Sequence, residues 1–165
     1  MKRLIFISII MLVFFGVACR KPVKYSDIPE IKFKSFYLRD TIDALGDNAK
    51  VGTLLFYFVD GDGDIGLRQG DTFPPYDTLR YNLFTELYEK KDSVFEKIHI
   101  VNPNYRIPYL DEQQGQNKTI KGDIKVDFTF TDPDKYKTIK YKFYIMDRAF
   151  HKSNVDSTYE IKYSD

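Results

Sequence analysis

The chemistry of this chain concentrates in a short run of alternating aspartates and glycines. Asp60, Asp62 and Asp64 occupy every second position and are separated by Gly61 and Gly63. Three carboxylates so close together repel one another unless a positive charge lies among them. Glycines let the backbone fold tightly enough for carboxylate and carbonyl oxygens to converge, as a hard cation such as calcium requires. The run therefore indicates a candidate calcium site.

A second interpretation of the acidic run needs no metal. Asp-Gly pairs also favour tight hairpin turns, in which acidic side chains are exposed to solvent. An EF-hand matches poorly, because Ile65 stands where that loop needs glycine, no glutamate closes the loop, and the flanks predict strands. The sequence alone leaves a cation site and a solvated turn both open.

The segments around the acidic run predict an all-β fold. Residues 53–59 are apolar on both alternating faces, as in a central strand. No segment of useful length has helical periodicity, and about seven antiparallel strands favour an immunoglobulin-like or fibronectin-like β-sandwich. In the strand expected after the acidic run, Leu79 and Tyr81 are among the residues predicted to face inward. The other strands are expected at residues 31–38, 79–88, 94–101, 124–130, 139–145 and 158–163.

This fold predicts which loops lie together. In an immunoglobulin-like sandwich three connections emerge at one end, here residues 60–78, 102–118 and 147–156. The acidic run is therefore expected near two polar residues of the last connection. The predicted metal ligands are Asp60, Asp62, Asp64, Asp147 and Asn154, with Asp111 and Glu112 at the flank.

Three tyrosines fall in the same loops. Most of the 13 Tyr and 14 Phe alternate within the expected strands and belong to the core. Tyr76, Tyr105 and Tyr109 lie outside those strands and are candidates for a surface that binds an unknown envelope protein or a glycan. The chain has no Trp, which would suit sugar stacking better.

The beginning of the chain indicates export and lipidation. Lys2 and Arg3 precede an apolar run at residues 4–15, which is too short to remain as a membrane-spanning helix. With the following Gly-Val-Ala-Cys at residues 16–19, this start resembles a bacterial lipoprotein signal peptide. The resemblance implies cleavage before Cys19, lipidation of its thiol and new amino group, and attachment to a membrane through that lipid.

The resulting organisation is a signal peptide at residues 1–18, a lipidated tether at 19–30 and a single domain at 31–165. The expected location is the bacterial cell envelope, at the outer membrane. In Bacteroidota-type lipoproteins an acidic cluster after the lipidated cysteine accompanies export to the cell surface. Its absence here favours the periplasm-facing side.

Composition excludes several classes of function. Removal of Lys2 and Arg3 with the signal peptide changes the formal net charge from +1 to −1, which gives no support to nucleic-acid binding. Cys19 is the only cysteine, so the mature domain has neither disulfides nor thiolate metal ligands. His99 and His151 lack ligand spacing, and no nucleophile motif or phosphate-binding loop is present. The sequence therefore predicts no catalytic residues, and a small envelope hydrolase is the least favoured reading.

Three segments, finally, resemble a known family. Residues 58–66, together with residues 145–149 and 153–155, resemble a family of Bacteroidota lipoproteins of unknown function with an Asp-Gly-Asp-Gly-Asp-Ile-Gly signature. The resemblance implies an envelope location and an immunoglobulin-like domain, and little chemistry. The expected function is a lipid-anchored binding or interaction module with a calcium-ordered loop end. The alternative is a structural accessory subunit of an envelope complex that holds no metal.

Overall fold

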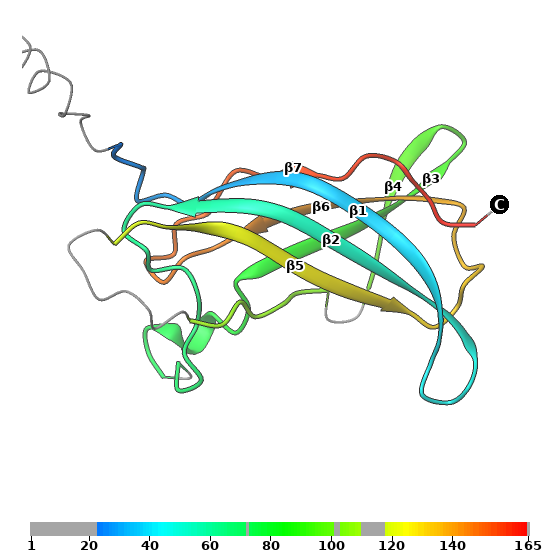
Figure 1. Ribbon diagram of the computed structural model, residues 1–165, viewed down its shortest axis with the longest axis horizontal. Helices are drawn as coiled ribbons and strands as arrows, with labels where there is room; N and C mark the ends of the chain where they lie inside the picture. Colours follow the sequence, from blue (N-terminus) through cyan, green and yellow to red (C-terminus); the bar gives the residue numbers. More distant parts are fainter. Residues whose placement is uncertain (1–22, 72, 101–102, 110–117, 165) are drawn as a thin grey trace, which may run out of the picture.

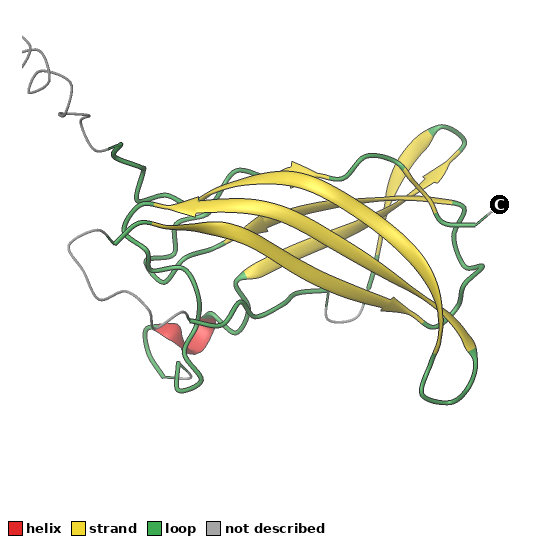
Figure 2. Ribbon diagram, viewed as in Figure 1, coloured by secondary structure: helices red, strands yellow, loops and turns green. Residues whose placement is uncertain are grey.

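The predicted β-sandwich is confirmed in the computed structural model, which describes residues 23–71, 73–100, 103–109 and 118–164. Within these residues the chain forms eight strands and one short 3₁₀ helix, arranged as two packed antiparallel sheets (Figures 1 and 2). The elements are β1 (Glu30–Ile42), β2 (Asn48–Asp60), η1 (Tyr76–Thr78), β3 (Leu83–Lys91), β4 (Val94–Ile98), β5 (Ile120–Phe130), β6 (Thr138–Ile145), β7 (Asp156–Ser157) and β8 (Ile161–Lys162).

The two sheets divide the strands as an immunoglobulin-like sandwich does. The small sheet has the order β1-β2-β5, which confirms β2 as a central strand. The large sheet has the order β4-β3-β6-β7, and β8 also pairs with β6. If the strands are lettered from A to G along the chain, A, B and E form one sheet, and C′, C, F and G form the other. This partition is that of the immunoglobulin family of folds without its strand D.

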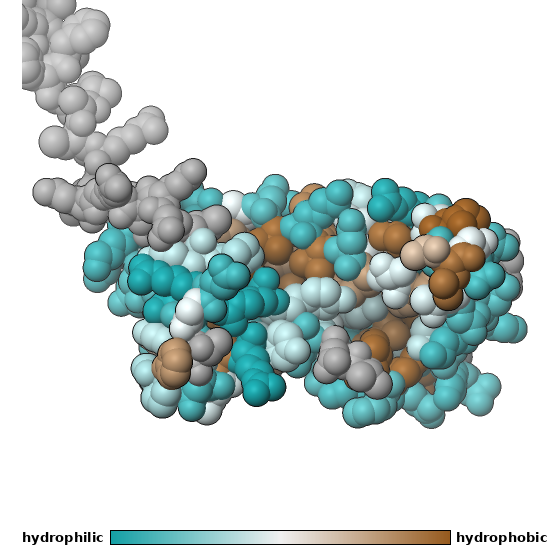
Figure 3. Space-filling view, turned by 90° about the horizontal axis from the view of Figure 1, so that it is seen from below, coloured by the Kyte–Doolittle hydropathy of each residue, from teal (hydrophilic) through white to brown (hydrophobic). Residues whose placement is uncertain are grey.

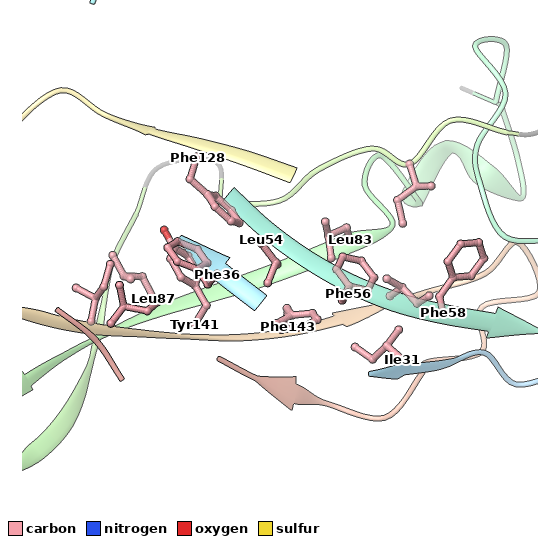
Figure 4. Packing of buried hydrophobic residues seen from close by; sticks show 14 of the residues in the cluster. Ile31, Phe36, Leu54, Phe56, Phe58, Leu83, Leu87, Phe128, Tyr141 and Phe143 are labelled. Carbon is pink, nitrogen blue, oxygen red and sulfur yellow. The ribbon is translucent and has the colours of Figure 1, made fainter. Parts of the chain in front are cut away.

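Aromatic side chains fill the space between the sheets (Figure 4). From β2, Phe56 packs against Phe143 of β6 with ring centroids 5.1 Å apart. Phe128 of β5 stacks on Tyr141 of β6 at 4.6 Å. Truncating an aromatic residue in such a core typically costs about 3–5 kcal/mol, so this packing holds the two sheets together.

The strand expected at residues 79–88 begins later than predicted. Leu79 is buried, but its N–H donates to the carbonyl of Tyr76 at 3.0 Å and closes the 3₁₀ turn of η1. Tyr81 was expected to face inward and is 36% exposed. The prediction of strand at residues 79–82 was therefore wrong, because a local turn competes for the backbone there.

The last predicted strand is interrupted. In place of one strand at residues 158–163, the chain forms β7 and β8, so the sandwich has eight strands. Between them, Thr158 hydrogen-bonds the backbone of Tyr141 twice. Its N–H donates to the Tyr141 carbonyl at 2.9 Å, and its hydroxyl accepts from the Tyr141 N–H at 3.0 Å. A side chain thus replaces part of the regular strand pairing at this point.

One end of the sandwich gathers the end of β2, the connection after β6 and the segment that precedes β1 (Figure 1). The segment before β1 contacts the acidic run directly, because Gly61 donates its N–H to the carbonyl of Ser26 at 2.8 Å. Residues 1–22, which include the predicted signal peptide and Cys19, lie outside the described part of the chain. No helix among the described residues is long and apolar enough to cross a membrane.

Candidate metal centre

Three aspartates from two loops converge at this end of the sandwich. Asp60, Asp64 and Asp147 each offer a carboxylate oxygen, and these oxygens all lie within 4.8 Å of one another. Asp60 is the last residue of β2 and Asp147 follows β6, so the cluster joins the small sheet to the large one. Asp60 and Asp147 are fully buried and Asp64 is half-buried. This group could hold a metal ion.

Several of the carboxylate oxygens at this site are buried without a hydrogen-bond partner. They are Oδ1 of Asp60, Oδ1 of Asp62 and Oδ1 of Asp64. Proteins pair almost all of their buried polar atoms, so three unpaired anionic oxygens in one place need an explanation. A cation shared among them would supply the missing interaction.

The burial and the close spacing of these carboxylates raise their pKa values. Burial raises the pKa of Asp60 to about 7, and the negative charges of Asp62 and Asp64 add to that shift. Burial also raises the pKa of Asp64 to about 6, with a further contribution from the charge of Asp147. The carboxylate form is therefore disfavoured at these positions in the absence of a counter-charge.

The acidic run follows a path that depends on its glycines. Asp60 Oδ2 accepts the N–H of Ile65 at 2.9 Å, which folds the run back on its own start. A Cβ at Gly61 would lie 2.3 Å from the carbonyl oxygen of Ser26, and Gly63 has a φ of 69°. The run does not form the tight hairpin that Asp-Gly pairs favour, because β2 and β3 belong to different sheets.

Asp147 is held by a tight turn of its own. Its Oδ1 accepts the N–H of His151 at 2.7 Å, and its Oδ2 lies 2.9 Å from His151 Nδ1. Phe150 closes the turn with a φ of 65°. Burial raises the pKa of Asp147, while its contacts with His151 lower it. In return, the charge of Asp147 raises the pKa of His151.

Asn154, the fifth predicted ligand, has a different role. Its amide oxygen accepts the N–H of Ile31 at 2.8 Å, and its amide nitrogen donates to the Ile31 carbonyl at 3.0 Å. The side chain thus pairs with the outer edge of β1 as a strand would. Both of its polar atoms form hydrogen bonds with this backbone.

Two of the three predicted binding tyrosines meet on one arginine. The guanidinium of Arg148 lies 4.2 Å from the ring centroid of Tyr76 and 5.5 Å from that of Tyr109. It also forms an ion pair with Asp71. Tyr105 is elsewhere: its backbone pairs with that of Leu83, and its ring packs against the core.

Sequence reasoning missed the roles of Arg148 and His151. Arg148 directly follows Asp147, so the candidate metal centre and the arginine that contacts Tyr76 and Tyr109 are adjacent in the chain. His151 follows Asp147 by four residues, a spacing that permits contact within one turn, but the sequence does not show that this loop turns so tightly. Asp111 and Glu112 lie outside the described residues.

Comparison of the chain with protein-family models, with curated proteins and with solved structures finds no match.

Proposed function

We propose that this chain is a lipid-anchored binding module of the bacterial cell envelope, with a loop end ordered by a calcium ion. The observation that carries the proposal is the fully buried Asp60, whose Oδ1 has no hydrogen-bond partner although it belongs to a cluster with Asp64 and Asp147. A solvated turn would leave such an oxygen in water. A calcium ion would neutralise charges that burial otherwise makes costly.

The donor atoms favour calcium over other metals. All the candidate ligands are carboxylate oxygens, which suit hard cations, whereas structural zinc prefers thiolate and imidazole. Calcium binds oxygens at about 2.3–2.6 Å, so two ligands on opposite sides of the ion stand roughly 4.8 Å apart. The carboxylate separations in the cluster stay within that limit. Magnesium needs a tighter octahedron at about 2.0–2.1 Å and retains more water.

The proposed ion would order the surface next to it. Asp147 and Arg148 are neighbours in the chain, and the guanidinium of Arg148 packs against the rings of Tyr76 and Tyr109. Tyr76 also stacks on Phe150 with centroids 6.5 Å apart, and Phe150 is 42% exposed. Tyr76 and Tyr109 are half-buried, and tyrosine and arginine are the residue types enriched in protein-binding hot spots. We therefore favour an envelope protein over a glycan as the partner.

The proposed lipid at Cys19 would set the orientation of this surface. Between Cys19 and Val23 the chain spans at most about 14 Å when fully extended. The acidic end, which contacts Ser26, would then lie close to the membrane. The partner would accordingly be a protein at or near the same membrane.

Thermal unfolding of the chain from Val23 onward, which contains every contact described above, tests the calcium site. We expect millimolar calcium to raise the unfolding midpoint relative to EDTA, because a ligand bound only by the folded state stabilises that state. At a calcium concentration of 100 times Kd the gain is about 2.7 kcal/mol. The double variant Asp62→Asn, Asp64→Asn should lose this gain.

Asp134→Asn is the matched control. Asp134 is exposed in the turn between β5 and β6, at the opposite end of the sandwich, so its neutralisation should leave the calcium response intact. An equal midpoint in EDTA and calcium for the unmodified chain would contradict the proposed site. Loss of the response in Asp134→Asn would show that it arises from charge in general.

A further inference from the structure

The small sheet has two outer edges, β1 and β5. Among the described residues, side chains from the C-terminal segment hydrogen-bond the backbone of β1 but not that of β5. The β1 edge is covered by side chains from the C-terminal segment. Asn154 pairs with the backbone of Ile31, and Asp156 Oδ2 accepts the N–H of Phe33 at 2.6 Å. The hydroxyl of Tyr159 donates to the carbonyl of Phe36. These contacts block the addition of another strand to β1.

The β5 edge is open in the described structure. β5 is the last strand of its sheet, and among the described residues no hydrogen bond joins its backbone to any segment other than β2. It is 11 residues long. A long edge with free N–H and C=O groups is a template for pairing with another strand.

Two pockets lie beneath this open edge. The first is mainly apolar and forms a groove of about 440 Å³ under residues 123–127, lined on its inner side by Phe58, Ile65, Leu83 and Ile107. The second, about 260 Å³, lies under residues 128–132 and is more polar, and Tyr105 borders both. Figure 3 looks at the molecule from below the view of Figure 1 and shows apolar surface between hydrophilic side chains. The groove could accept the inward-facing side chains of an added strand.

The sequence of β5 carries charges that complement themselves. Along its exposed face the residues read Lys121, Asp123, Lys125 and Asp127. If two copies pair antiparallel with Ile124 opposite itself, each lysine faces an aspartate of the other copy. The pairs are Lys121 with Asp127, Asp123 with Lys125, and the two symmetric equivalents.

The same register suits the other face of the strand. It places Gly122 opposite Val126 and Ile120 opposite Phe128, all of which face the groove side of the sheet. In this register an even-numbered residue always faces an even-numbered residue, and an odd-numbered residue an odd-numbered one. The backbone N–H and C=O groups that point away from β2 in one copy therefore face the same groups of the other copy. A two-fold axis at Ile124 would therefore satisfy hydrogen bonds, charges and apolar contacts together.

We propose that β5 is a self-association edge, through which a second copy of this chain pairs to form a continuous six-stranded sheet. Its order would be β1-β2-β5-β5-β2-β1. Ile124 and Val126 of the second copy would enter the groove under β5. The proposal is independent of the cation and of the lipid anchor.

Charge reversal tests the register directly. Sedimentation equilibrium of the chain from Val23 onward should give a dimer. Lys125→Asp and Asp123→Lys each place like charges opposite each other in two symmetric pairs, and should each raise the dimer Kd about tenfold or more. An equimolar mixture of the two variants should restore the dimer, since every pair at positions 123 and 125 is then of opposite sign.

Lys32→Asp is the matched control. Lys32 is exposed on β1, at the covered edge of the same sheet, and its reversal should leave the dimer unchanged. An unmodified chain that stays monomeric at about 200 µM, where a dimer with a Kd of about 1 µM would be almost fully formed, would overturn the proposal. In that case any strand that pairs with β5 would have to come from a different protein. Equal weakening by Lys32→Asp would overturn it as well.

A disulfide trap keeps the proposal testable if Asp123→Lys fails to fold without the ion pair between Asp123 and Lys34. The chain from Val23 onward contains no cysteine. Ile124→Cys places a thiol opposite its own copy at a cross-strand distance that a disulfide can bridge, so oxidation should yield a covalent dimer. Ile120→Cys, which faces Phe128 in this register, should not. A covalent dimer from both variants, or from neither, would overturn the register.

Discussion

Aspartates shape turns at both ends of this sandwich, but the two ends use them in opposite ways. At the end formed by the β1–β2 turn, Asp43 is half-buried, and its Oδ1 accepts the N–H groups of Leu45 at 2.8 Å and Asp47 at 3.0 Å. At the other end, Asp60 is fully buried with one oxygen unpaired. Backbone N–H groups and water satisfy the carboxylate oxygens of an aspartate in a turn, whereas in the buried cluster some carboxylate oxygens have no hydrogen-bond donor.

A buried side chain also ties two segments of the acidic end together. Asn82 is fully buried there and bonds both polar groups of Ile107, with its Nδ2 donating at 3.2 Å and its Oδ1 accepting at 2.6 Å. Its own carbonyl accepts the N–H of Met146 at 2.9 Å. One residue thus ties the loop at residues 103–109 to the segment that leads into Asp147.

The largest effect is expected at this connection. Asn82→Ala leaves the buried N–H of Ile107 without a partner, whereas the Ile107 carbonyl keeps the N–H of Leu67 at 3.0 Å. The substitution should therefore lower the free energy of unfolding by about 1–3 kcal/mol. Urea unfolding in EDTA measures it. Asn48→Ala is the control, because Asn48 is exposed at the start of β2 and should change stability by less than about 0.5 kcal/mol. Equal losses would contradict the difference between the two ends.

The next effect is a pH dependence confined to the acidic end. Burial raises the folded-state pKa of Asp60 to about 7 and of Asp64 to about 6, above the ordinary value of 3.8. A carboxyl with a raised pKa binds more protons when folded than when unfolded. Its contribution to stability is therefore complete below the ordinary pKa and is lost as pH rises through the folded-state values.

In EDTA, the stability of the unmodified chain relative to Asp60→Asn, Asp64→Asn should accordingly fall between pH 4 and pH 7, which brackets the shifted pKa values. Saturating calcium should reverse this trend, because protons compete with the cation for the same oxygens. Urea unfolding across this range measures both slopes. Parallel curves in EDTA and calcium would count against a cation at these carboxylates.

The smallest effect is expected at the opposite end. Asp43→Ala removes an acceptor from two exposed backbone N–H groups and should cost about 1 kcal/mol, equally in EDTA and in calcium. Thermal unfolding in both solutions measures it. A loss of stability that depended on calcium would contradict the claim that only the cluster aspartates bind the ion.

The sandwich itself could be predicted because its strands alternate clearly. Ile124, Val126 and Phe128 alternate with charged residues, and β2 is apolar on both sides because it is central. The sequence did not show where local turns would replace strand pairing. Leu79 belongs to a 3₁₀ turn, and Thr158 interrupts the last strand, since each forms short-range contacts that an alternating pattern does not reveal.

Part of the candidate site followed from the order of the strands. Placing the connections after β2 and β6 at one end of the sandwich was enough to bring Asp60, Asp64 and Asp147 together. Asn154 could not be placed, because its position depends on which backbone edge needs a partner. Tyr105 turned inward for a similar reason, since its segment pairs with Leu83.

Calcium titration by isothermal calorimetry tests the central claim most directly. The unmodified chain from Val23 onward is expected to bind one ion per chain, Asp134→Asn is expected to bind equally, and Asp60→Asn, Asp64→Asn is expected to bind none. Heat from a single site that vanishes only in the cluster variant would support a calcium-ordered end. Absence of binding to the unmodified chain at millimolar calcium would contradict it and leave the buried aspartates without a counter-charge.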